Sequence, residues 1–337
     1  MSDDSLPGSI GLLDPSSMGS VIEENKEEIL IGSFPHYRRL PYPDKSNLCD
    51  CDKAFKDKVK GAMKEVGEKF ASNQELDNLI LSGTYQEGDW KCHRKKGSDK
   101  GDIENNLFYN FDGSVCFKKL AKTGIRFEKN PLKSKDGQYH YNYSLMKTES
   151  PSEPQYYNSK VIAELKGCVL TEPRDALRVW YDVKSSGKPE PKSRRPIRDK
   201  DFGLVVDIFT NEKVEKVNLA DLIKHVFDGI ITSFHYDKVE DSYYERTKEI
   251  ISCKLGLLNN EDNARLDEFL KSSDGSESLL GERAKLFWYT KDGRIQTNPA
   301  DDRCIFGELV VKYDKKERQD ARCVINFKVL SLESSQS

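Results

Sequence analysis

The sequence predicts an α+β protein built from two related lobes, each a twisted mixed sheet with one helix packed against it. Segments with the apolar pattern of strands are interspersed with segments of helical periodicity along the chain. Two distant stretches also match, because aligning Asn105 with Asp221 places Phe111-Asp112-Gly113 on Phe227-Asp228-Gly229. The match indicates an internal duplication with pseudo-twofold packing. The alternative is a chance identity of three residues.

The composition is that of a folded protein with a balanced charge. Of the 337 residues, 33% are charged and 36% hydrophobic, and the 15 Phe, 15 Tyr and 3 Trp argue against wholesale disorder. The net charge of -3 excludes a protein that coats nucleic acid generally, so any contact with DNA or RNA must come from local basic patches. The chain has no apolar run of about 18 residues and no secretory signal, which predicts a soluble, cytoplasmic protein without a membrane partner.

The length suffices for two domains, and composition places their boundary near residue 150. We expect a mobile N-terminus rich in Ser, Gly, Asp and Pro, two α+β lobes that meet at the PSEP sequence, and a disordered Ser-rich tail. The predicted segments are 1–25, 26–150, 151–331 and 332–337.

In the first lobe, the helix over 52–71 has the strongest pattern, because Phe55, Val59, Met63, Val66 and Phe70 recur at helical spacing. Strands are expected on either side of it, and an Asp-Gly turn at 135–137 predicts a hairpin. The predicted strands are 28–34, 76–84 and 139–146.

In the second lobe, alternating apolar residues predict a strand over 176–183, and a continuous apolar run predicts another over 202–209. The repeated motif helix follows over 218–229. Residues 255–285 form a polar insertion with one helix at 260–270. The lobe ends in an expected hairpin of 305–313 against 322–330.

The densest cluster of acidic and amide side chains lies in the sequence GDIENNLFYNFDG, residues 101–113. Asp102, Glu104 and Asp112 are expected at or near the start of a buried helix. Carboxylates brought together repel one another, and Mg2+ or Mn2+ with oxygen ligands would relieve that repulsion. The alternative is that Asp102 and Glu104 cap the helix, whose N-terminal dipole favours negative charge, while Asp112 is solvated.

The two matching stretches resemble complementary, incomplete copies of the acidic motif of RusA-type Holliday junction resolvases, Asp-x-Asp-Asn-x-x-Lys-x-x-x-Asp. The first copy has both acids, the Asn and the last Asp in register, but Phe108 stands at the lysine position. The second copy has Lys224 and Asp228 in register, but the first acidic positions are Asn218 and Ala220, and Asp221 replaces the Asn.

The resemblance implies a metal-dependent nuclease with a catalytic Lys224 and the metal ligands Asp102, Glu104, Asp112 and Asp228. It also implies a further acidic pair after the motif. The best matches for that pair are Asp237 in the second half and Glu128 in the first.

A basic loop precedes each motif copy, and cations beside a metal site suit phosphate contacts without sequence preference. The alternative is a pair of solvated surface loops. The predicted nucleic-acid contacts are Lys91, Arg94, Lys95, Lys96, Arg194 and Arg195.

Two other functions compete with the nuclease. A non-catalytic binding or scaffold protein is favoured by Phe108 and Ala220, which replace charged residues of the motif. A nucleotidyltransferase would place Ser82-Gly83-Thr84 in a glycine loop ahead of Asp102 and Glu104. Most of the eight cysteines are expected to be reduced, and a zinc site is an alternative for Cys49, Cys51, Cys92 and His93.

Overall fold

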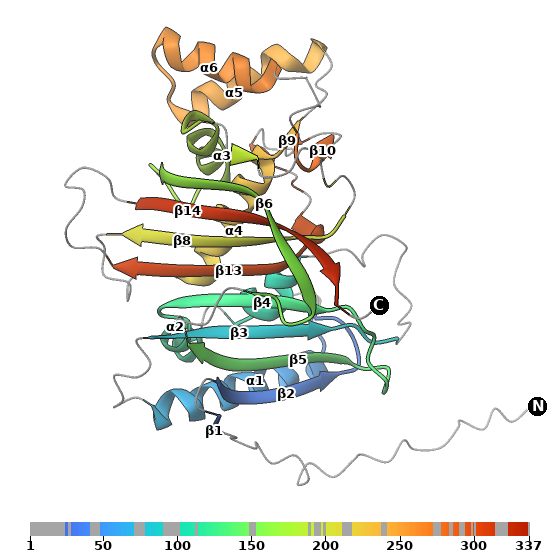
Figure 1. Cartoon of the computed structure of the whole chain (residues 1–337). Coiled ribbons are helices and arrows are strands. Elements are labelled where there is room, and N and C mark those ends of the chain that lie inside the picture. Colours follow the sequence, from blue (N-terminus) through green and yellow to red (C-terminus); the bar gives the residue numbers. More distant parts are fainter. Residues whose placement is uncertain are drawn as a thin grey trace, which may run out of the picture.

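The α+β class is confirmed by the computed structural model, in which helices pack on one large mixed sheet (Figure 1). The initial segment 1–23 and the six basic residues predicted to contact nucleic acid lie outside the described residues. The structure describes residues 24–25, 28–40, 48–70, 78–89, 102–111, 114–147, 153–187, 190–191, 197, 200–210, 218–236, 241–271, 278–282, 286–289, 294–297, 299, 301–313 and 323–335.

Ten strands from both halves of the chain form the large sheet, in the order β1-β2-β5-β3-β4-β13-β8-β14-β6-β7. The first half contributes β1 (Glu24–Asn25), β2 (Glu28–His36), β3 (Leu79–Gln86), β4 (Gly124–Asn130) and β5 (Tyr139–Lys147). The second half contributes β6 (Tyr157–Val169), β7 (Glu190–Pro191), β8 (Phe202–Thr210), β13 (Cys304–Tyr313) and β14 (Cys323–Ser334).

The strand directions follow one pattern in each half. In the first half, β3 is parallel to β4 and antiparallel to β5, which is antiparallel to β2. In the second half, β8 is parallel to β13 and antiparallel to β14, which is antiparallel to β6. The halves join in the middle of the sheet, where β4 and β13 pair antiparallel with Leu309 opposite Ile125.

The helices α1 (Asp50–Lys69), α2 (Val115–Leu120) and α4 (Leu219–Ser233) lie behind the sheet in the view of Figure 1. The predicted periodicity of α1 is confirmed, because Phe55, Val59, Met63 and Val66 are all buried. The apolar core is continuous across the two halves. The ring of Phe127 on β4 lies 5.9 Å from that of Phe227 on α4, measured between centroids.

The predicted strand over 176–183 is wrong, because these residues lie in helix α3 (Ala176–Ser185). Asp175 caps the helix by accepting hydrogen bonds from the backbone N–H groups of Leu177 and Arg178. Val179 belongs to the main core, whereas Trp180 belongs to a second apolar cluster. A helix buried on two faces loses the single apolar stripe by which helices are recognised.

The second apolar cluster joins α3 to a helical pair, and this pair lies at one end of the molecule (Figure 1). The pair consists of α5 (Asp241–Leu255), which the sequence did not predict, and α6 (Asn260–Lys271), which it did. Short strands pair beside it, namely β9 (His235–Tyr236) with β10 (Gly281–Glu282) and β11 (Phe287–Tyr289) with β12 (Ile295–Thr297). Among the helices that the structure describes, none has the length and apolar composition needed to cross a membrane.

Both predicted hairpins are wrong. Strand β3 lies between β4 and β5, and β8 lies between β13 and β14, so each expected partner pairs with an intervening strand. The predicted disordered tail is also partly wrong, because residues 332–334 complete β14 and Ser335 hydrogen-bonds to the backbone oxygen of Tyr156.

Candidate metal centre

Three segments that are far apart in the sequence meet at one acidic cluster. The first begins at Asp102 and continues into a short π-helix, η3 (Asn105–Tyr109). The second is α4, and the third is the 3-10 turn η5 (Asp301–Arg303), which leads directly into β13. Contacts of η3 and η5 with α4 bring the carboxylates of Asp102, Glu104 and Asp301 to the side chain of Lys224.

The ammonium of Lys224 lies among four carboxylates. Its Nζ is 3.0 Å from Oδ2 of Asp102 and 3.6 Å from Oδ2 of Asp228, which is one helical turn further along α4. It is 3.9 Å from Oε1 of Glu104 and 3.9 Å from Oδ2 of Asp301. One positive charge therefore faces four acidic groups.

Asp102, Glu104 and Asp301 could hold a metal ion, since one ligand oxygen from each lies within 4.8 Å of the others. Two further oxygens belong to residues that contact the cluster, since the Asn105 amide donates to Asp102 and Asp228 pairs with Lys224. Oδ1 of Asp228 and Oδ1 of Asn105 are buried and accept no hydrogen bond from the described residues. The oxygen-only donor set suits a hard divalent cation such as Mg2+ or Mn2+.

Burial shapes the electrostatics of the cluster. Glu104 is 5% exposed, and its burial, reinforced by the charge of Asp102, holds its pKa well above the usual range. The pKa of Asp301 is also held well above its usual range, first by burial and then by the charge of Asp228. Burial alone would lower the pKa of Lys224, but the four surrounding carboxylates outweigh it and raise that pKa. The surrounding carboxylates therefore favour the charged form of Lys224.

The backbone around Asp102 is fixed by side chains from the first half. The amide of Asn105 donates to Oδ2 of Asp102 at 2.5 Å, and the amide of Asn106 donates to the Asp102 carbonyl at 2.9 Å. The guanidinium Nε of Arg39 donates to the side-chain oxygen of Asn106. The hydroxyl of Tyr143 donates to the carbonyl of Leu107 at 2.8 Å. Single-turn π-helices are frequent at functional sites, where they redirect side chains.

Four of the five predicted site residues come together here, namely Asp102, Glu104, Lys224 and Asp228. The fifth, Asp112, lies outside the described residues, as does Asp237. The sequence interpretation missed Asp301. The available signal was the acidic pair Asp301-Asp302 directly before an apolar strand.

The prediction that Glu128 corresponds to the second acidic pair is not supported by its position. Its carboxylate accepts the backbone N–H groups of Gln155 and Tyr156 at 3.0 and 2.8 Å, which anchors the chain between the two halves. The helix-capping alternative for the acidic motif is also weakened. Asp102 and Glu104 contact Lys224, whereas Glu104, the N-cap of η3, makes no side-chain capping hydrogen bond.

The glycine loop required by a nucleotidyltransferase is not formed by residues 82–84. They lie in the middle of β3, where Ser82 pairs with Arg126 and Ser144 on the neighbouring strands. A Cβ atom at Gly83 would lie 3.1 Å from the ring of Phe108, so the glycine allows close packing. In the alternative zinc site, Cys49 and Cys51 are exposed free cysteines, and Cys92 and His93 lie outside the described residues.

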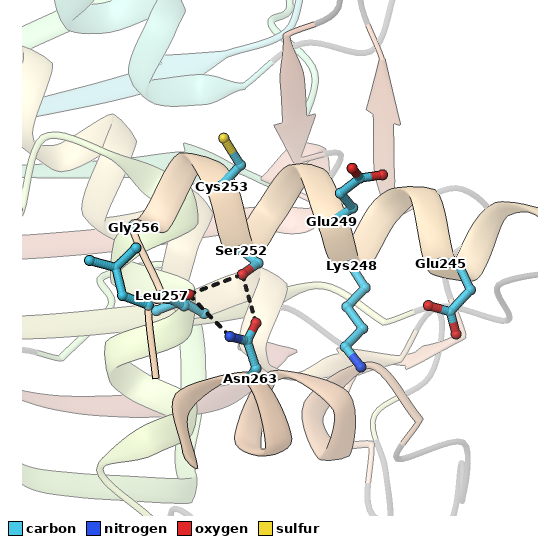
Figure 2. Close-up of a pocket in the computed structure, with 9 residues that line it drawn as sticks. Glu245, Lys248, Glu249, Ser252, Cys253, Gly256, Leu257 and Asn263 are labelled. Atoms are coloured by element: carbon cyan, nitrogen blue, oxygen red, sulfur yellow. Dashed lines mark hydrogen bonds between the residues drawn. The ribbon is translucent and has the colours of Figure 1, made fainter. Parts of the chain in front are cut away.

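A separate pocket lies between α5 and α6 (Figure 2). Asn263 bridges its two walls, because its amide donates to the carbonyl of Leu257 at 3.1 Å and its oxygen accepts from the Ser252 hydroxyl at 2.6 Å. Lys248 on its wall is 2.7 Å from Asp267. The pocket includes none of the acidic cluster.

The raised pKa values predict a pH dependence of stability in the metal-free protein. The protonated forms of Glu104 and Asp301 favour the folded state. Their contribution is complete below the unfolded pKa of about 4 and is lost as the pH rises through the raised values. The Glu104→Gln variant removes one such group, so its free energy of unfolding should fall less with rising pH. Urea unfolding in EDTA between about pH 5 and about pH 8 measures this, and parallel curves for parent and variant would contradict it.

The chain was compared with protein-family models, with curated proteins and with solved structures, and none of the three comparisons found a match.

Proposed function

We propose that this chain binds DNA or RNA and hydrolyses phosphodiester bonds with Mg2+ or Mn2+ held by Asp102, Glu104 and Asp301. The observation that carries the proposal is the convergence of four carboxylates on a single lysine. One ammonium cannot neutralise four carboxylates in a mostly buried cluster, so without a metal the pKa values of Glu104 and Asp301 are raised and their protonated forms are favoured. A hard divalent cation would displace those protons, balance the carboxylate charge and use the free oxygens of Asp228 and Asn105.

The residues fit hydrolysis of a phosphodiester. A bound divalent cation would polarise the phosphate and make a water molecule more acidic. Asp102, Glu104 and Asp301 are the nearest groups to hold it. Lys224 would stabilise the negative charge that develops on the phosphate, and Asp228 positions the ammonium for that task.

The origin of the residues supports the resemblance to RusA-type resolvases. The acids Asp102 and Glu104 come from the first motif copy, and Lys224 and Asp228 come from the second. The first copy lacks the lysine, which the second copy supplies. The second copy lacks the first two acids, which the first copy supplies. Two incomplete copies can therefore form one complete site, provided that the halves lie as they do here.

We also propose that the two halves arose by duplication and are related by a pseudo-twofold axis. Each half runs strand, helix, strand, motif helix and two further strands, and the spatial order β2-β5-β3-β4 corresponds to β6-β14-β8-β13. A twofold axis makes equivalent neighbouring strands antiparallel, which describes β4 and β13. The helical pair α5 and α6 is then an insertion in the second half.

A non-catalytic binding protein is the second candidate. The observation in its favour is that Lys224 already lies at the centre of the acidic cluster, where a cation would otherwise be expected. In that case the lysine and its carboxylates would stabilise the contact between the halves.

Incubation with labelled single-stranded, duplex and branched DNA and RNA separates these functions. We expect the purified chain to cut at least one substrate with Mg2+ or Mn2+ and none with EDTA, because hydrolysis needs the cation. Binding of a substrate without cleavage of any would support the non-catalytic candidate. Absence of binding even at low salt, where phosphate contacts are strongest, would contradict both.

A further inference from the structure

If the halves are related by duplication, every group in the acidic cluster has a counterpart across the pseudo-twofold axis. The alignment that superposes the two motif copies pairs Asp102 with Asn218, Glu104 with Ala220 and Lys224 with Phe108. It also pairs Asp228 with Asp112, which lies outside the described residues. A symmetric molecule would build a second metal centre from the counterparts.

The counterparts that the structure describes cannot form such a centre. Phe108 is fully buried, and its ring centroid lies 5.9 Å from that of Phe117 and 6.5 Å from that of Tyr143. Ala220 is 3% exposed and belongs to the same apolar core. The lysine position and one carboxylate position have therefore become hydrophobic packing.

The remaining ligand, Asp301, also has no acidic counterpart. It lies three residues before β13, and residues 118–123, which precede the corresponding strand β4, include no acid. Among the residues that the structure describes, the cluster of Asp102, Glu104 and Asp301 is the one group suited to a metal ion.

We infer that the molecule has a single metal centre shared between its halves and that it cuts one strand per binding event, leaving a nick. The inference rests on the proposed function. A pair of sites related by a twofold axis can cut two strands of one bound nucleic acid, whereas a single site must release or reposition its substrate before a second cut.

Titration of the metal-free chain with Mn2+ tests the number of centres, with free Mn2+ counted by electron paramagnetic resonance. The Asp102→Asn/Asp301→Asn variant removes ligands of the shared centre. Asp221→Asn removes the one acid among the residues that correspond to Asp102, Glu104 and Asn105 in the second motif copy. We expect the double variant to lose all specific Mn2+ binding and Asp221→Asn to bind as the parent does. The double variant removes charges that repel one another, so it should fold, and circular dichroism checks this.

Two results would overturn the inference in distinguishable ways. If the double variant keeps about half of the parent's Mn2+ and Asp221→Asn loses the other half, a second centre exists and the proposed function stands. If the parent binds no Mn2+, the proposed function fails and the inference fails with it.

Cleavage of a branched DNA whose strands carry different dyes tests the cutting pattern. With DNA in large excess over protein, we expect early products to carry one cut strand each. Molecules with two cut strands should appear only after singly cut DNA has accumulated. Doubly cut molecules present from the first time point would contradict a single centre.

Discussion

Replacing Asp102 by asparagine should lower the cleavage rate by about 100-fold or more while nucleic-acid binding persists. The substitution keeps the size of the side chain but removes one negative charge from the metal centre. Metal catalysis contributes several kcal/mol to transition-state stabilisation, and each 1.36 kcal/mol lost is about tenfold in rate. Without a metal ion, the same carboxylates repel a substrate phosphate, so binding in EDTA should be unchanged or tighter.

Asp50→Asn is the matched control for this experiment. Asp50 is a fully exposed residue in the first turn of α1, and its partner is the exposed Lys53. The chemical change is the same, but the residue lies outside the acidic cluster, so cleavage should match that of the parent. If Asp102→Asn cleaves as well as the parent, the activity does not depend on this centre.

Replacing Lys224 by methionine should weaken cleavage and strengthen metal binding at the same time. Methionine fills a similar volume without a charge, so the cluster loses its one cation while four carboxylates remain. Loss of a group that stabilises the transition state costs about 100- to 1000-fold in rate. Mn2+ no longer competes with an ammonium, so its dissociation constant should fall.

The stability of the Lys224→Met variant should depend strongly on metal. Breaking a mostly buried ion pair leaves uncompensated charge and costs on the order of 3 kcal/mol in the metal-free protein. Saturating Mn2+ should restore much of this loss, because a ligand at about 100 times its dissociation constant stabilises by about 2.7 kcal/mol. Thermal unfolding with EDTA and with Mn2+ measures both effects.

Lys248→Met provides the control for a lost ion pair, because Lys248 is 2.7 Å from Asp267 on the helical pair. The rise in the unfolding temperature of Lys248→Met on addition of Mn2+ should equal that of the parent. An equal Mn2+ shift in Lys224→Met and in the parent would show that the lysine and the cation do not share a site, and would favour the non-catalytic candidate.

The sequence predicted those parts of the fold that depend on local pattern. Helix α1 was recognised because Phe55, Val59 and Met63 lie on one buried face. The convergence of Asp102 with Lys224 was predicted only through the resemblance and the repeat, because no local pattern links residues so far apart in the chain.

The errors arose where tertiary contacts override local pattern. Helix α3 is covered on both faces, so apolar residues occupy more than one side of the helix. Along the sequence these residues alternate with polar ones as they do in a strand. The hairpins failed because β3 and β8 insert between strands that are neighbours in sequence, and strand insertion leaves no local signal. Asp301 was missed because the helical pair α5 and α6 separates it from the motif helix that it approaches.

Anomalous diffraction from crystals of the protein with Mn2+ tests the central claim most directly. We predict a peak bound by oxygens of Asp102, Glu104 and Asp301, and no peak there in Asp102→Asn/Asp301→Asn crystals prepared identically. A parent crystal at saturating Mn2+ with the Lys224 ammonium still among the four carboxylates and no peak beside it would contradict a metal centre.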